Sequence, residues 1–115
     1  MYGKASDNGF VELLPGIAIK ALCHGEHSTM VEFRLKKGAL LPEHSHPNEQ
    51  TGYLVSGGMR LYAGLAAREV GPGDSWCIPK DMLHKAEILE DTVAVEVFSP
   101  PRLDYHKYLL AEDII

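Results

Sequence analysis

Nine consecutive residues, Pro42–Gln50, bring together side chains that commonly bind metal ions. They include the imidazoles of His44 and His46 and the amide of Gln50. Alternate side chains of an extended strand leave on the same face, so the two imidazoles would point to one side of the chain. Gln50 follows a Pro47–Asn48 pair that favours a turn, and its amide oxygen can then re-enter the next strand facing the same pocket. This spacing predicts most of a metal site.

A later histidine, His84, is the expected remaining ligand. A His-x-His pair alone is a weak signal, because surface strands carry such pairs by chance. The neighbouring glycines strengthen it: Gly38 stands six residues before His44, and Gly57 stands seven after Gln50. The histidines without metal spacing to this set are interpreted as surface or loop residues: His24, His27 and His106.

The pattern around these residues resembles the first motif of the cupin superfamily. That motif reads glycine, five residues, His-x-His, three or four residues, glutamate, six residues and glycine. The corresponding positions in this chain are Gly38, His44, His46, Gln50 and Gly57. Gln50 stands in place of glutamate, as it does in some small single-domain cupins, whereas Glu49 has the wrong parity for the same face.

The second cupin motif also has a counterpart further along the chain. It reads glycine, five residues, Pro-x-Gly, two residues, histidine, three residues and asparagine, and Gly73, Pro79 and His84 match it. Asp81 replaces the second glycine, and aspartate can fill the same turn role. Ile88 replaces the asparagine, whose loss says little about the metal.

The resemblance extends from about Gly16 to Phe98 and implies an all-β cupin jelly-roll β-barrel. It also implies one divalent transition metal held by four ligands, His44, His46, Gln50 and His84. Three neutral imidazoles and an amide leave the ion its full double charge, so the centre should be a strong Lewis acid. Such a centre suits isomerisation, hydration or ring opening of a sugar-like substrate. The donor set favours Zn, Ni, Fe, Co or Mn over Ca or Mg.

Length and composition limit the remaining choices. The 115 residues suffice for one domain whose core needs no disulfide. We expect a single cupin domain with an arm at residues 1–15, a barrel at about 16–99 and a tail at 100–115. Eleven basic and sixteen acidic residues, without a basic cluster, predict a small-molecule partner and no nucleic acid. The chain has neither a leader-like segment nor an apolar run of about 18 residues, so we expect a cytoplasmic protein without a membrane partner.

Short extended segments separated by glycine and proline turns predict the strands of the all-β fold. Val31, Phe33 and Leu35 alternate with charged residues and should face the core. We expect two hairpins, one turning at Ser56–Gly58 and one at Glu90–Asp91.

The sequence also allows predictions for the cysteines, for the N-terminal arm and for the C-terminal tail. Both cysteines should be reduced, and Cys77, which lies between Trp76 and Ile78, should be buried. Phe10–Leu14 should pair at a sheet edge or with a partner subunit, and the sheet edges of so small a barrel predict a homodimer. Tyr105–Asp113 should form a short helix or pack across the barrel.

The segment Glu96–Asp104 resembles the end of the small cupins that linearise unsaturated monouronates in pectin and alginate breakdown. In that group an acidic residue, a phenylalanine two residues later and an arginine four residues beyond line the metal pocket. Glu96, Phe98 and Arg102 fill these positions, although the usual acid is aspartate. The resemblance implies a catalytic acid or base at Glu96, a substrate contact at Phe98, and a catalytic carboxylate anchor at Arg102. Alternation along Val93–Phe98 puts Glu96 and Phe98 on one face.

Three function classes remain open. The leading one is a metal-dependent lyase or isomerase that acts on an unsaturated uronate or a related sugar. The second is a dioxygenase with Fe or Cu, which needs open metal positions for oxygen and usually a larger apolar pocket. The third is a small-ligand-binding or storage module without turnover.

Overall fold

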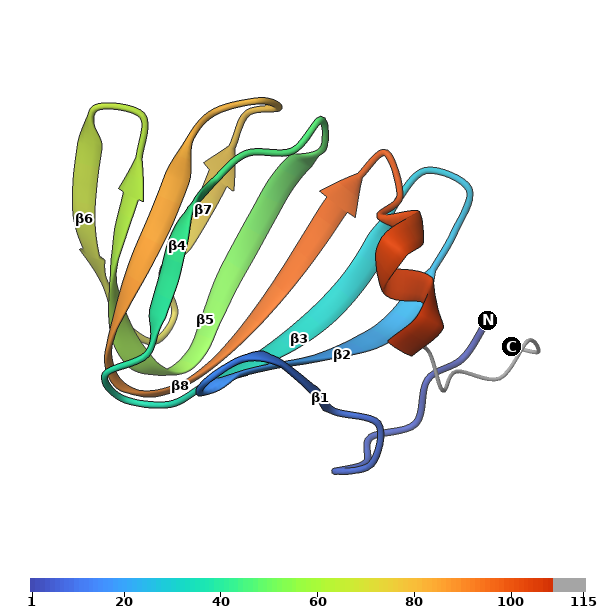
Figure 1. Cartoon of the computed structure of the whole chain (residues 1–115). Helices are drawn as coiled ribbons and strands as arrows, with labels where there is room; N and C mark the ends of the chain where they lie inside the picture. Colours follow the sequence, from blue (N-terminus) through green and yellow to red (C-terminus); the bar gives the residue numbers. More distant parts are fainter. Residues whose placement is uncertain (109–115) are drawn as a thin grey trace.

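Eight β-strands and one short 3-10 helix make up residues 1–108, the part of the chain that the computed structural model describes (Figure 1). In chain order they are β1 (Val11–Leu14), β2 (Ile17–His24), β3 (Thr29–Leu35), β4 (Leu40–His44), β5 (Glu49–Ala63), β6 (Ala66–Val70), β7 (Ser75–Ile78), β8 (His84–Ser99) and η1 (Leu103–Tyr108). All strand pairs are antiparallel, in the order β1-β2-β3-β8-β5-β6, with β4 on β8 and β7 on β5.

The sheet folds over on itself because its two longest strands run through both layers (Figure 1). The first half of β8 pairs with β4 and its second half with β3. The first half of β5 pairs with β7 and its second half with β6, while β5 and β8 stay paired along almost their whole length. This arrangement confirms the jelly-roll β-barrel that the sequence predicts.

The two expected hairpins are wrong, because β5 and β8 continue through the segments that were expected to turn. Both strands bend there instead, and the pairing register shifts between Ser56 and Gly58. Gly57 has φ +93, and a Cβ at this position would collide with the backbone of Asp91 and Thr92. The glycine therefore permits a bulge and a close approach of two strands rather than a reversal of one.

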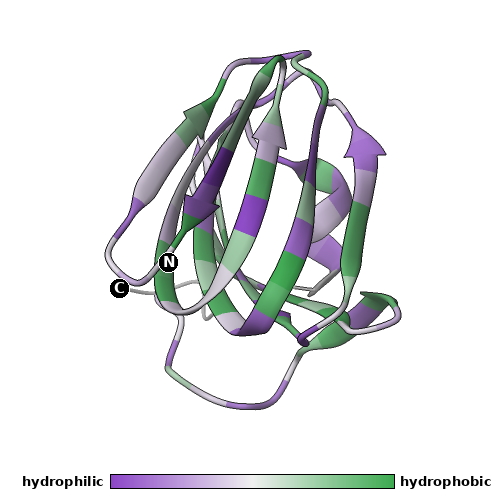
Figure 2. Cartoon of the chain, turned by 90° about the vertical axis from the view of Figure 1, so that its left-hand side faces the viewer, coloured by the Kyte–Doolittle hydropathy of each residue, from purple (hydrophilic) through white to green (hydrophobic). Residues whose placement is uncertain are grey.

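Side-chain alternation decides what faces the interior. Figure 2 shows hydrophobic and hydrophilic residues alternating in bands along the strands. The core side chains predicted on β3, Val31, Phe33 and Leu35, are all buried. The same parity turns Cys77 outward between two inward-facing neighbours, so the expectation that this thiol is buried is wrong.

The N-terminal arm lies on the outer face of β2 and β3. The Arg34 guanidinium stacks on the Phe10 ring at 4.0 Å and forms a 3.0 Å ion pair with Asp7. Lys20 Nζ donates a 2.9 Å hydrogen bond to the carbonyl of Ser6. β1 pairs with β2 of the same chain, which agrees with the expected edge position. The homodimer stays a prediction.

The helix η1 is tied to the end of the barrel through His106. The His106 ring stacks on His24 with centroids 3.9 Å apart, and its Nε2 lies 3.1 Å from Thr29 Oγ1. The expectation was that all three remaining histidines are surface or loop residues. His24 and His106 are instead half-buried and stacked on each other, whereas the His27 side chain is 88% exposed. The short helix expected over Tyr105–Asp113 is present as η1 up to Tyr108, and residues 109–113 lie outside the described residues.

Within residues 1–108, no helix has the length and apolar character needed to cross a membrane.

A first prediction concerns the bend. Gly57→Ala should destabilise the fold more than Gly38→Ala, because both glycines have a positive φ but only the alanine at 57 also collides with neighbouring backbone. The positive φ alone costs on the order of 1–3 kcal/mol, and the collision should add to it. Urea unfolding of the two variants measures the difference. Equal losses would contradict the close approach of β5 and β8.

A second prediction concerns η1. Burial and the neighbouring His24 lower the pKa of His106, while Asp104 opposes the shift. The docked helix therefore favours neutral His106 and should loosen as the pH falls below the usual histidine pKa of 6.5. Intrinsic amide exchange slows as the pH falls, so the readout is the protection factor, which corrects for this slowing. The protection factors of the η1 amides should fall from pH 7 to about pH 5. His106→Phe keeps a ring but cannot be protonated, and should abolish that fall.

Candidate metal centre

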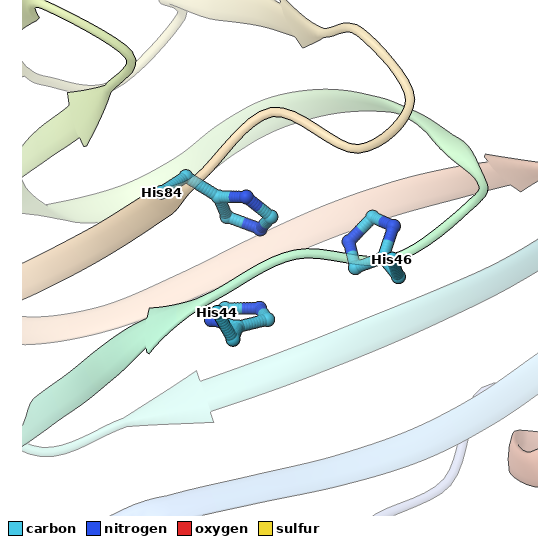
Figure 3. Close-up of side chains that lie close together, drawn as sticks. All are labelled: His44, His46 and His84. Carbon is cyan, nitrogen blue, oxygen red and sulfur yellow. The ribbon is translucent and has the colours of Figure 1, made fainter.

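Three histidines converge between the two layers of the barrel (Figure 3). His44 ends β4, His46 lies in the loop that follows, and His84 begins β8, where it pairs with His44. One ring nitrogen from each lies within 4.8 Å of the others. His46 and His84 are buried and His44 is half-buried. The structure thus brings together the three histidines that the sequence singles out.

Backbone carbonyl groups set the orientation of all three rings. The Nδ1 atoms each lie near a carbonyl oxygen: His44 to Pro42 at 2.8 Å, His46 to Asn48 at 3.0 Å and His84 to Met82 at 2.9 Å. A neutral imidazole has one N–H, and these bonds place it on Nδ1. Each Nε2 therefore keeps a lone pair that can bind a metal, and the carbonyl partner holds the ring in place.

The Gln50 side chain provides a direct test of whether a cation fits. Its Nε2 donates a 2.7 Å hydrogen bond to the Glu96 carboxylate, which turns Oε1 toward His46 Nε2 at 2.9 Å. Two lone pairs then face each other, because His46 carries its proton on Nδ1. The Nε2 of His84 is buried and has no hydrogen-bond partner among the described residues. A cation bound to these three atoms would satisfy all of them, so the residues fit a divalent metal. Gln50 as fourth ligand stays a prediction.

Burial favours the neutral form of two of the three histidines, His46 and His84. It lowers the pKa of His84 to about 4, against the opposing hydrogen bond to Met82. Burial also lowers the pKa of His46. Neutral imidazoles are the form that coordinates metal, so His46 and His84 can bind an ion at neutral pH without first losing protons.

Glu96 lies directly behind Gln50 on the inner face of β8. Glu96 is only 8% exposed. Phe98, two residues later on the same face of β8, is 2% exposed, as the alternation of the strand predicts. Burial raises the pKa of Glu96 to about 7, although the hydrogen bond from Gln50 acts in the opposite direction. A carboxyl group in this environment can hold or release a proton near neutral pH.

Arg102 lies beside the histidine cluster, but its guanidinium already has a partner. Its Nε and Nη2 donate hydrogen bonds of 3.0 and 2.9 Å to the Asp104 carboxylate. The guanidinium also stacks on Tyr105 at 4.2 Å and on Phe98 at 5.1 Å. Phe98 in turn meets the His46 ring edge-on at 5.4 Å. Asp104 and Tyr105 were not predicted from the sequence, and the Arg-x-Asp spacing was the available signal for the first of them.

Asn48 is a second residue whose role was not predicted from the sequence. It was assigned only to a turn, yet its side chain is buried and donates a hydrogen bond to the carbonyl of Pro100. Its own carbonyl accepts from His46. Asn48 therefore connects the ligand loop with the start of the C-terminal tail.

The space around the centre has a small inner part and an open outer part. An inner cavity of about 30 Å³ is bounded by Gln50, His84 and Glu96 and by apolar core side chains. This is room for about one water molecule. An open groove of about 390 Å³ runs over His46 and the tail that includes Arg102. A small polar molecule can approach the cluster from this groove.

The cupin domain family matches residues 31–100 of the chain, which is more than half of its length. This protein belongs to the cupin family. The cupin is 28% identical to KdgF from Halomonas sp., with a TM-score of 0.85 over 90% of this chain and 98% of that one. It has the same fold as an RmlC-like cupin from Shewanella frigidimarina, at 22% identity and TM-score 0.85 over 90% of this chain and 94% of the other. No curated protein matches the sequence.

A larger enzyme contains a similar domain. The cupin matches an oxalate decarboxylase from Bacillus subtilis with 26% identity and a TM-score of 0.69, over 74% of this chain and 26% of that one. With its three-histidine cluster, the chain has the features of a metal-dependent small-molecule cupin.

A third prediction tests the centre. His84→Ala should lower metal affinity by more than the roughly 10- to 100-fold typical of losing a residue that supports a ligand. His27→Ala removes a histidine that is 88% exposed and should leave the metal content unchanged. Elemental analysis after gel filtration measures both variants. Equal metal content in wild type and His84→Ala would refute the assignment.

Proposed function

We propose that this cupin is a metal-dependent enzyme that performs lyase or isomerase chemistry on an unsaturated uronate or a related sugar acid. One observation carries the proposal: a buried carboxylate, Glu96, and a guanidinium, Arg102, flank the three-histidine cluster. The similarity to KdgF, an unsaturated-uronate-linearising cupin, supports the same class of substrate.

The ligand set in this proposal is His44, His46, Gln50 and His84, which would hold Zn, Ni, Fe, Co or Mn. A divalent ion held by these four neutral ligands would supply a Lewis acid able to polarise a carbonyl or hydroxyl oxygen of the substrate. The three carbonyl-bound Nδ1 atoms leave the Nε2 lone pairs of the histidines free to hold the ion. Gln50 has a second role, because its amide also holds the carboxylate of Glu96 at 2.7 Å.

Glu96 is the proposed proton-transfer group. Opening of a hemiacetal ring moves a proton from one oxygen to another, and isomerisation moves one between oxygen and carbon. A carboxyl group beside the reacting oxygen can take up the proton and return it in either case. The carboxylate is buried and held by Gln50, so it has a fixed position relative to the metal ligands. Aspartate is usual at this position, and the longer glutamate reaches Gln50 from the inner face of β8.

Arg102 is the proposed anchor for the substrate carboxylate. Asp104 already presents a planar carboxylate to two of its nitrogens, which is the geometry that a uronate carboxylate would adopt. The Asp104 side chain is 60% exposed, so it can swing into solvent when the substrate takes its place. Tyr105 and Phe98 hold the guanidinium plane during this exchange.

The dioxygenase alternative has less support. It calls for a larger apolar pocket, whereas the inner cavity measures about 30 Å³. Oxygen uptake by the Fe- or Cu-loaded protein tests this alternative directly. A non-catalytic binding module would bind the sugar acid without turnover by any metal form.

A fourth prediction concerns Glu96. Glu96→Gln should lower kcat on an unsaturated uronate by ~10²–10⁴-fold, the usual contribution of a general acid or base. Metal content and fold should be unchanged. Glu90→Gln, on the exposed part of the same strand, is the matched control and should keep full activity. The proposal fails if the wild type consumes no unsaturated uronate with any of Zn, Ni, Fe, Co or Mn.

A fifth prediction concerns Arg102. Arg102→Lys should raise KM, since a point charge cannot reproduce the two parallel hydrogen bonds to a carboxylate. Asp104→Asn should lower KM, because it weakens the internal competitor for the guanidinium. Steady-state kinetics on the same substrate measures both variants. An unchanged KM for Arg102→Lys would show that the substrate carboxylate binds elsewhere.

A further inference from the structure

Gly52 leaves a slot in the inner face of the barrel that a tryptophan fills. Gly52 is buried in β5 and its missing side chain would point into the interior, as its neighbours Gln50 and Leu54 do. A Cβ at Gly52 would collide with the indole of Trp76, including its Nε1. The indole therefore lies directly across the Gly52 backbone, in space that any other residue would occupy.

Three adjacent strands place this indole next to Glu96. Gly52 pairs with Trp76 of β7 on one side and with Glu96 of β8 on the other. All three positions face inward, as the burial patterns of their strands show. An indole that starts on β7 and crosses Gly52 is directed toward the Glu96 carboxylate, because β8 is the next strand in that direction.

The indole N–H of Trp76 lacks a hydrogen-bond acceptor among the described residues. Its nitrogen, Nε1, is buried. It is nevertheless close enough to Glu96 to oppose the effect of burial on the pKa of that carboxyl group. Buried donors are almost always paired, and the Glu96 carboxylate is the acceptor that the strand order places beside this one.

We propose that Trp76 is a positioning residue that holds the Glu96 carboxylate from the side opposite Gln50, and that Gly52 admits the indole for this purpose. The Gln50 amide donates at 2.7 Å, and the indole N–H supplies the second donor. Two fixed donors restrict the rotation of a carboxylate about its terminal bond. The catalytic part of this inference rests on the proposed function, whereas the contact between Trp76 and Glu96 does not.

The contact can be tested without activity, because Trp76 is the single tryptophan of the chain and its fluorescence reports on this place alone. Emission spectra of the zinc-loaded protein should shift in Glu96→Gln and stay as in wild type in Glu90→Gln. Glu90 lies on the same strand but is exposed, so it controls for the loss of a charge. An unchanged spectrum in Glu96→Gln would overturn the proposed contact.

The positioning role is tested by kinetics. Trp76→Phe keeps an aromatic ring over Gly52 and removes only the N–H. It should lower kcat on an unsaturated uronate by roughly 10- to 100-fold, the loss expected for a hydrogen bond to a charged group, with KM and metal content unchanged. Full kcat in a correctly folded, metal-loaded Trp76→Phe would overturn the role. An inactive wild type would count against the proposed function and against this role, and the fluorescence shift would still decide the contact.

Discussion

The close approach of Gly57 to the backbone of Asp91 and Thr92 is the contact on which the arrangement of the site depends. It allows β5 and β8, the two longest strands, to bend together without losing their pairing. Each strand then contributes to both layers of the barrel. Without this shared bend, a single extended sheet would hold Gln50 and Glu96 far from the layer in which β4 and the start of β8 carry His44 and His84.

The centre built on this frame combines neutral metal ligands with one ionisable group in the same interior. Burial lowers the pKa of His46 and lowers that of His84 to about 4, while the same burial raises the pKa of Glu96 to about 7. One physical cause thus prepares the ligands for a cation and gives the carboxyl group a proton to exchange. Gln50 links the two functions, because one end of its amide faces His46 and the other donates to Glu96.

The C-terminal tail is attached to the barrel at both sides of the centre. Asn48 binds the carbonyl of Pro100, and Thr29 Oγ1 accepts the backbone N–H of Arg102 at 3.0 Å and lies 3.1 Å from His106. These contacts hold the guanidinium of Arg102 over Phe98. A local opening of η1 would therefore affect the substrate anchor before it affected the metal ligands, which are held by β4, β8 and the loop between β4 and β5.

Features that depend on local spacing and strand parity could be predicted from the sequence. Glu49 points outward while Gln50 points inward, and Glu96 shares the interior with Phe98, because alternate residues of a strand face alternate sides. His44 and His46 also meet in one cluster, although His46 lies in the loop after β4. Glycine and proline punctuation predicted an all-β sandwich or barrel, and the resemblance to the two cupin motifs narrowed this to the jelly roll. The tertiary structure alone decided whether Ser56–Gly58 is a turn or a bulge, since both use the same glycines and differ only in which strand lies opposite. It also decided that Arg102 binds Asp104, that Asn48 holds the tail and that Trp76 crosses Gly52, because these contacts follow from strand order and register between segments distant in the chain, which no local pattern encodes.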